Sequence, residues 1–259
     1  MFDSPHSAPP RPTVRPSVVA LPGTGSDADF ARRAFESAAA ALDLRFHAVQ
    51  PDPRAVVASY RAALDGAAQD GPVLAAGISL GAAVAVEWAA EHTGSGRVAG
   101  VVAALPAWTG PDAADCPAAL SAAFTARCLR ADGLEAVIEQ MRASSPGWLG
   151  AALTQSWRSQ WPGLPEALEE AASHTWPDAE RLAELHVPVA VVATTDDPVH
   201  PLAVGERWAA LIPDATLDRL TLDELGADPA VLGHLGLAAL SRVLGPIPAR
   251  SGAEPAPAG

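Results

Sequence analysis

Short apolar runs alternate along the chain with longer segments in which apolar positions recur at helical spacing. The runs are nearly continuous in Val, Ala, Leu and Ile, which is typical of parallel strands covered by helices on both faces. The predicted strands are Ser17 to Leu21, Leu44 to Val49, Val73 to Ile78, Val98 to Leu105, Val187 to Ala193 and Ala215 to Leu220. The predicted helices among them are Asp27 to Leu42, Arg54 to Ala68, Leu80 to His92, Leu202 to Ile212 and Pro229 to Leu244. This alternation predicts an α/β fold with a mostly parallel sheet and helices on both faces.

The alternation stops between Pro106 and Leu185, where helical segments are separated by Pro and Gly. We therefore predict a helical cap over residues 106–185, inserted into a core formed by residues 13–105 and 186–245. The ends, residues 1–12 and 246–259, are rich in Pro, Ala, Gly and Ser and are predicted to be disordered tails. Most tryptophans lie in the cap segment, where they either line an apolar acyl site or hold the cap on the core: Trp108, Trp148, Trp157, Trp161 and Trp176.

Charge and composition narrow the class of protein. The chain has 17 Lys and Arg against 30 Asp and Glu, a formal charge of −13 that argues against nucleic-acid and anionic-membrane partners. It contains neither a secretory signal pattern nor an apolar stretch of about 20 residues, so we expect a soluble cytoplasmic protein. Because no His, Asp or Glu cluster has metal-ligand spacing, we expect neither metal nor cofactor. The sequence does not fix the oligomeric state.

Candidate chemistry begins at the segment Gly77-Ile78-Ser79-Leu80-Gly81, which fits the pattern Gly-x-Ser-x-Gly. The segment lies where a predicted strand passes into a predicted helix. A sharp turn there needs flanking residues without side chains and lifts the serine hydroxyl above the sheet edge, at a helix N-terminus. Ser79 is therefore the candidate nucleophile. The alternative is an ordinary glycine-rich turn with Ser79 as the helix N-cap.

The order of strand, turn, helix, insertion and two later strand–helix units resembles the α/β-hydrolase family from about Val14 to Leu244. The resemblance implies an α/β-hydrolase fold and a triad in the chain order Ser, acid, His. Asp197, in the segment Thr194-Thr195-Asp196-Asp197-Pro198-Val199-His200-Pro201, best matches the family's acid loop, with Asp196 as the competitor. A helix-capping turn would also explain this loop.

The histidine is selected from seven by its position in the chain. His234, in the segment Leu232-Gly233-His234-Leu235-Gly236, follows the last predicted strand and resembles the family's histidine loop, so it is the predicted general base. A capping or core histidine in the final helix is the alternative. His200 neighbours the acid loop and is a candidate for the pocket wall.

The predicted oxyanion hole departs from the family pattern. Many members have His-Gly after the first core strand, whereas this chain has Pro22-Gly23-Thr24-Gly25-Ser26-Asp27. Such a site needs backbone N–H groups rather than particular side chains. The resemblance then implies the backbone N–H groups of Thr24 and Leu80, and a glycine turn before a helix capped by Ser26 or Asp27 is compatible with this.

These features together predict a serine hydrolase of the carboxylesterase or thioesterase kind. We expect it to cleave an ester or thioester acyl bond of a small apolar substrate through an acyl-enzyme. The alternatives are an acyltransferase, or a catalytically silent binding or accessory protein on the same fold. In the cap, Arg127, Arg130 and Arg142 either receive a carboxylate or phosphate or form solvated helix surface.

Overall fold

A computed structural model describes residues 15–244, and within this range the strands form one sheet of six in the order β2-β1-β3-β4-β5-β6. Every neighbouring pair is parallel. The strands are β1 (Ser17–Leu21), β2 (Arg45–Ala48), β3 (Val73–Ile78), β4 (Val98–Ala104), β5 (Val189–Thr194) and β6 (Ala215–Leu220). Each begins within two residues of its predicted start. The predicted tails, residues 1–12 and 246–259, lie outside the described residues.

Alternate side chains of the strands enter two separate apolar layers, one on each face of the sheet. In β1, Val18 points into the layer that contains Phe35, and Val19 points into the layer that contains Trp88 and Trp208. The strands β1, β3 and β5 are buried along their whole length, whereas β2 alternates between exposed and partly buried positions at one edge. Burial on both faces explains the continuous apolar runs in the sequence.

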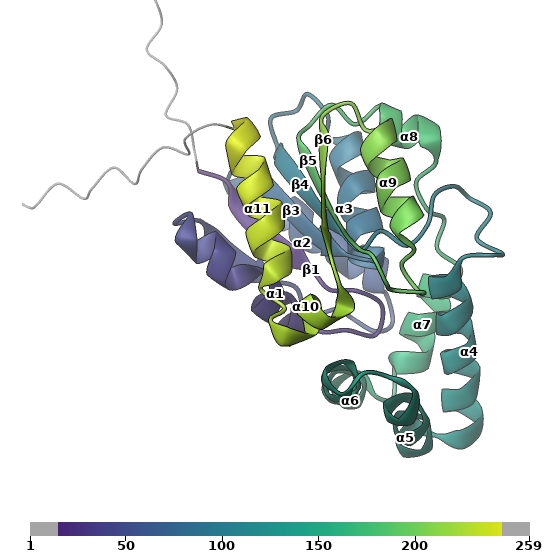
Figure 1. Cartoon of the computed structure of the whole chain (residues 1–259). Coiled ribbons are helices and arrows are strands. Elements are labelled where there is room, and N and C mark those ends of the chain that lie inside the picture. Colours follow the sequence, from purple (N-terminus) through teal and green to yellow (C-terminus); the bar gives the residue numbers. More distant parts are fainter. Residues whose placement is uncertain (1–14, 245–259) are drawn as a thin grey trace, which may run out of the picture.

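Helices cover both faces of this sheet (Figure 1). On one face α1 packs against α11 and β1, and on the other α2 and α3 pack against β3. The helices of the core are α1 (Ala28–Ala41), α2 (Val56–Asp70), α3 (Leu80–Glu91), α8 (Ala179–Ala183), α9 (Leu202–Leu211), α10 (Leu222–Ala227) and α11 (Val231–Leu244). The sequence pattern does not predict α10, which is only 6 residues long.

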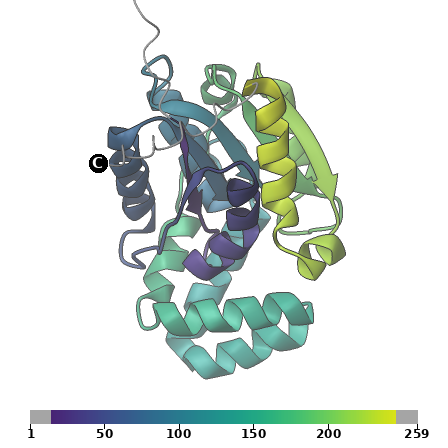
Figure 2. The same cartoon turned by 90° about the vertical axis from the view of Figure 1, so that its left-hand side faces the viewer.

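Four helices between β4 and β5 form a separate layer at one end of the sheet, and Figures 1 and 2 show them there from two directions. They are α4 (Pro117–Asp132), α5 (Leu134–Ser144), α6 (Gly147–Gln160) and α7 (Leu164–Ala172). We call these four helices the cap. The next helix, α8, packs against α3 and α9 instead. The predicted cap range, 106–185, therefore includes one helix that lies on the core. Among residues 15–244, no helix is long and apolar enough to cross a membrane.

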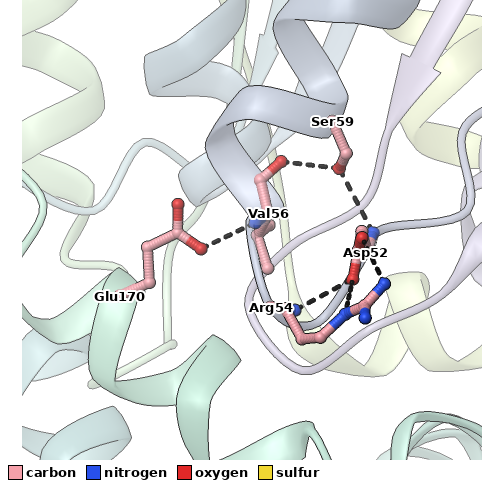
Figure 3. A network of polar contacts seen from close by, with 5 residues as sticks. All are labelled: Asp52, Arg54, Val56, Ser59 and Glu170. Carbon is pink, nitrogen blue, oxygen red and sulfur yellow. Dashed lines mark hydrogen bonds and ion pairs between the residues drawn. The ribbon is translucent and has the colours of Figure 1, made fainter.

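A carboxylate joins the cap to the core at the start of α2 (Figure 3). Glu170 of α7 accepts hydrogen bonds from the backbone N–H of Val56 at 2.6 Å and of Val57 at 3.1 Å. The N-cap residue of α2, Ala55, makes no side-chain cap bond, so Glu170 pairs N–H groups that would otherwise lack a partner in the helix. Nearby, Ser59 accepts from the backbone N–H of Asp52. The start of α2 is thus stabilised by a negative charge from another element.

Replacing Glu170 with alanine is expected to lower the free energy of unfolding by about 1–2 kcal/mol, because two backbone donors lose their acceptor. Urea unfolding followed by circular dichroism measures the change. The matched control is Glu139→Ala on an exposed position of α5, for which we expect a change of less than about 0.5 kcal/mol. Equal effects of the two substitutions would show that the contact with α2 contributes nothing.

Candidate active site

Ser79 occupies the turn between β3 and α3, with a φ of 54° that non-glycine residues rarely adopt. The neighbouring glycines make this turn possible. A Cβ on Gly77 would lie 2.1 Å from the carbonyl oxygen of Gly81, and a Cβ on Gly81 would lie 2.4 Å from that of Leu21. Neither position has space for a side chain. The first turn of α3 can therefore pack directly on the ends of β1 and β3, with Ser79 between them.

The imidazole of His200 lies between Ser79 and a carboxylate. Its Nε2 is 3.0 Å from Ser79 Oγ, and its Nδ1 is 2.7 Å from Oδ2 of Asp197. An ionised carboxylate can only accept, so the proton resides on Nδ1 and Nε2 is free to accept the Ser79 O–H. Both His200 and Asp197 come from the loop between β5 and α9. The three side chains form a continuous hydrogen-bonded chain.

Asp197 is held in its ionised form. Burial by itself raises the pKa of this carboxyl. The hydrogen bond from His200 and its electrostatic attraction lower the pKa by more than that, and so do the backbone N–H groups of Val199 and His200. The pKa therefore lies below its ordinary value. The backbone N–H of Val199 donates to Oδ1 at 2.8 Å, which leaves Oδ2 directed at the imidazole. The carboxylate is therefore charged at neutral pH and fixed in orientation.

A cavity of about 590 Å³ opens above Ser79, between the core and the cap. Its walls are mostly apolar, and the only Asp, Glu, Lys or Arg among the lining residues is Asp197. Two cap tryptophans, Trp148 and Trp157, line it. Phe124 of α4 also lines it and is 60% exposed, which places this ring at the rim. Such a cavity accommodates a small uncharged molecule.

The loop between β1 and α1 passes beside Ser79. A Cβ on Gly23 would lie 3.5 Å from Cβ of Ser79, and Thr24 lines the same cavity as Ser79 and His200. Leu80 is the first residue of α3, so its N–H is among the helix-terminal groups that have no partner within the helix. Of the predicted oxyanion hole, Leu80 thus adjoins Ser79 and Thr24 lines the same cavity, and the role of their N–H groups stays a prediction.

The comparisons with known proteins agree with this architecture. The sequence profile of the alpha/beta hydrolase family matches residues 7–241. The chain belongs to the α/β-hydrolase family.

Solved structures of this fold resemble the chain at low sequence identity. MenH from S. aureus is 16% identical, with a TM-score of 0.65 over 88% of this chain and 94% of that one. An enol-lactonase from Burkholderia xenovorans LB400 is 16% identical, with a TM-score of 0.63 over 89% and 93%. The esterase RhEst1 from Rhodococcus sp. ECU1013 is 20% identical, with a TM-score of 0.60 over 88% and 89%. A search of curated proteins finds no significant match.

The main correction to the sequence analysis of this α/β-hydrolase concerns its histidine. His234 is an exposed residue of α11, and its Nε2 lies 3.2 Å from Oγ of Ser37 on α1. The segment after β6 does not form a histidine loop. It forms α10, whose capping box of Thr221 and Glu224 starts the helix at once. His234 comes only after this helix, on the face of the sheet that α1 covers, and His200 makes the contact with Ser79 instead.

The two adjacent aspartates have different partners. Asp197 contacts His200, whereas Oδ1 of Asp196 accepts a hydrogen bond from the backbone N–H of Leu222 at 2.8 Å. Asp196 thereby holds the start of α10, and Leu222 and Leu225 of that helix line the cavity. The segment after β6 thus contributes apolar side chains to the cavity wall.

The tryptophans and arginines of the predicted cap segment have different surroundings in the structure. Trp148 and Trp157 line the cavity, whereas Trp176 is buried in the core layer around Trp88 and Trp161 is 41% exposed. Trp148 and Trp157 thus lie where an acyl site would need them, and Trp176 packs in the core instead. Of the three arginines considered as anion ligands, none lines the cavity. Arg130 instead forms ion pairs with Glu166 and Glu169, which join α4 to α7.

Proposed function

We propose that this chain is a serine hydrolase that cleaves ester or thioester bonds of small, uncharged acyl substrates through a triad of Ser79, His200 and Asp197. The observation that carries the proposal is the position of the His200 imidazole, with one nitrogen at hydrogen-bonding distance from Ser79 and the other from Asp197. This is the arrangement that makes a serine hydroxyl nucleophilic.

The reaction follows from these contacts. The Ser79 proton moves to Nε2 of His200 while Oγ bonds to the acyl carbon, and the electron pair of the C=O bond moves to oxygen. The N–H groups of Thr24 and Leu80 stabilise that oxyanion. As the bond to the leaving group breaks, the leaving group takes the proton from Nε2. Water then gives a proton to His200, attacks the acyl-enzyme and releases the carboxylic acid, and Ser79 recovers its proton.

The cavity bounds the substrate. If each non-hydrogen atom takes about 30 Å³, the volume of one molecule in liquid water, the cavity holds roughly 20 non-hydrogen atoms. The lining residues include no Lys or Arg that could pair with an anionic acyl chain. Such a chain would lose its hydration on entering the cavity and gain no ion pair in return. A neutral chain instead gains about 0.8 kcal/mol for each buried CH₂ group. We therefore expect medium-length neutral acyl groups to react fastest.

Labelling with a fluorophosphonate probe and a panel of p-nitrophenyl esters tests the proposal. The probe is expected to modify Ser79, as mapped by peptide mass spectrometry, and to leave the Ser79→Ala variant unlabelled. The hexanoate ester should exceed the acetate in kcat/KM by at least about tenfold, and the ester of a chain ending in a carboxylate should react more slowly than its neutral counterpart. Failure of the probe to label Ser79 would favour a binding protein, and faster reaction of the anionic ester would overturn the substrate class.

A further inference from the structure

The cap contacts the oxyanion loop, which we define as residues 22–26, through the last residue of α6. Gln160 donates a hydrogen bond from Nε2 to the carbonyl oxygen of Ser26 at 3.0 Å and to that of Ser156 at 3.3 Å. Gln160 is only 4% exposed. Because water cannot readily replace a buried hydrogen bond of this kind, the contact fixes the distance between α6 and the loop.

The same helix contacts the loop again one turn earlier. Gly25 has a φ of +68°, and a Cβ there would lie 3.0 Å from Nε1 of Trp157. The indole ring therefore packs against the backbone of the loop at Gly25. Trp157 also lines the substrate cavity. One face of α6 thus touches both the oxyanion loop and the space for the acyl group.

The core contacts the other end of the loop. A narrow gap between the loop, the core and Gln160 is lined by Gly23, Thr24 and Leu80, and Oε1 of Gln160 is buried without a hydrogen-bond partner. From the core, the Tyr60 hydroxyl donates to the carbonyl oxygen of Pro22 at 2.9 Å, and burial raises the pKa of Tyr60, so this hydroxyl stays protonated. The loop is thus held at its start by Tyr60 of the core and at its end by Gln160 of the cap.

We propose that Gln160 is a positioning residue for the oxyanion hole: its hydrogen bond to Ser26 holds the N–H of Thr24 toward the reacting oxygen only while the cap is seated on the core. The inference rests on the proposed function and adds to it a link between the cap and the transition state. A substrate that fills the cavity under α6 stabilises the seated cap, and so completes the site that its own reaction needs.

Two ketones that share one hexyl chain test this inference. A trifluoromethyl ketone forms a tetrahedral adduct, in which Ser79 Oγ bonds to the carbonyl carbon, the serine proton moves to His200 and the carbonyl electron pair becomes an oxyanion. The corresponding methyl ketone fills the cavity without this adduct. Inhibition constants are measured for both ketones in the wild type, in Gln160→Met and in the matched control Gln155→Met, which alters an exposed glutamine of the same helix.

Gln160→Met is expected to weaken the trifluoromethyl ketone by about tenfold, as for the loss of support to one oxyanion donor, and the methyl ketone by less than twofold. Gln155→Met should change neither. The ratio of the two constants does not depend on the folded fraction, and Gln160→Glu, which has no donor when ionised, repeats the test. Equal weakening of both ketones, or no change in either, overturns the inference. A wild type that binds both ketones equally would contradict the proposed function instead.

Discussion

The His200→Ala variant is expected to lose at least about 10⁴-fold in kcat/KM toward the best ester of the panel. Without the imidazole, the Ser79 hydroxyl has no acceptor for its proton, because Nε2 of His200 is the group at 3.0 Å from Oγ. The substrate cavity and the oxyanion loop remain, so KM should change little and the loss should appear in kcat. Steady-state kinetics with active-site titration of the wild type measure the two parameters separately.

The matched control is His234→Ala, which removes the histidine that the family resemblance favours. His234 is exposed and contacts Ser37 on α1, so we expect its kcat/KM to stay within about twofold of the wild type. Circular dichroism and thermal unfolding of both variants establish that they are folded. A large loss in His234→Ala together with an active His200→Ala would reverse the assignment of the base.

Placing the proposed acid and the proposed base in one short turn has a structural consequence. Asp197 and His200 are three residues apart, and Pro198 and Pro201 follow them directly. Proline fixes its own φ and restricts the residue before it, so the backbone of this turn has few conformations to lose on folding. The pair is thus oriented by its own loop and by β5, without help from α11. The segment after β6 instead forms α10, which contributes to the cavity wall.

The parallel sheet could be predicted because its strands are buried on both faces. In β3 and β5 every residue is buried, so each appears in the sequence as an apolar run, with Thr194 as the polar last residue of β5. The sharp turn at Ser79 could be predicted for a similar reason, since Gly77 and Gly81 are required by contacts that no larger residue permits. The short helix α10 could not, because its 6 residues are too few to show a helical period.

The position of His200 beside Ser79 could not be predicted, because the resemblance places the histidine in a loop that this chain does not form. The resemblance predicts a histidine after the last strand, but α10 follows that strand directly, and His234 lies beyond it as an exposed residue of α11. The spacing of Asp197 and His200 was the available signal, since residues three apart in a turn lie close together. Their proximity does not reveal where the imidazole points, which depends on the conformation of the loop between β5 and α9.

Asp197→Asn is expected to lower kcat by about 10²- to 10⁴-fold, with the fold retained. An asparagine at this position keeps the shape of the side chain but loses the charge that stabilises the imidazolium, and its amide can present a donor to Nδ1 and favour the wrong tautomer of His200. The matched control is Asp196→Asn, because Asp196 binds the backbone N–H of Leu222 and not the imidazole. We expect it to retain most of the activity and to lose at most about 1–2 kcal/mol of stability. Similar losses of kcat in the two variants would contradict the assignment of Asp197.

The pH dependence of stability gives Asp197→Asn a second, independent readout. The pKa of Asp197 is lowered in the folded protein, so the folded state gains stability from the ionised carboxylate. That contribution is complete above the ordinary pKa of an aspartate and is lost as the pH falls below about 4, through the folded value. Asp197→Asn should therefore flatten the acid side of the stability curve, measured by urea unfolding between pH 3 and pH 7. An unchanged acid slope would mean that the carboxylate is not held in its charged form, and the imidazolium would then lack the partner on which the proposed mechanism depends.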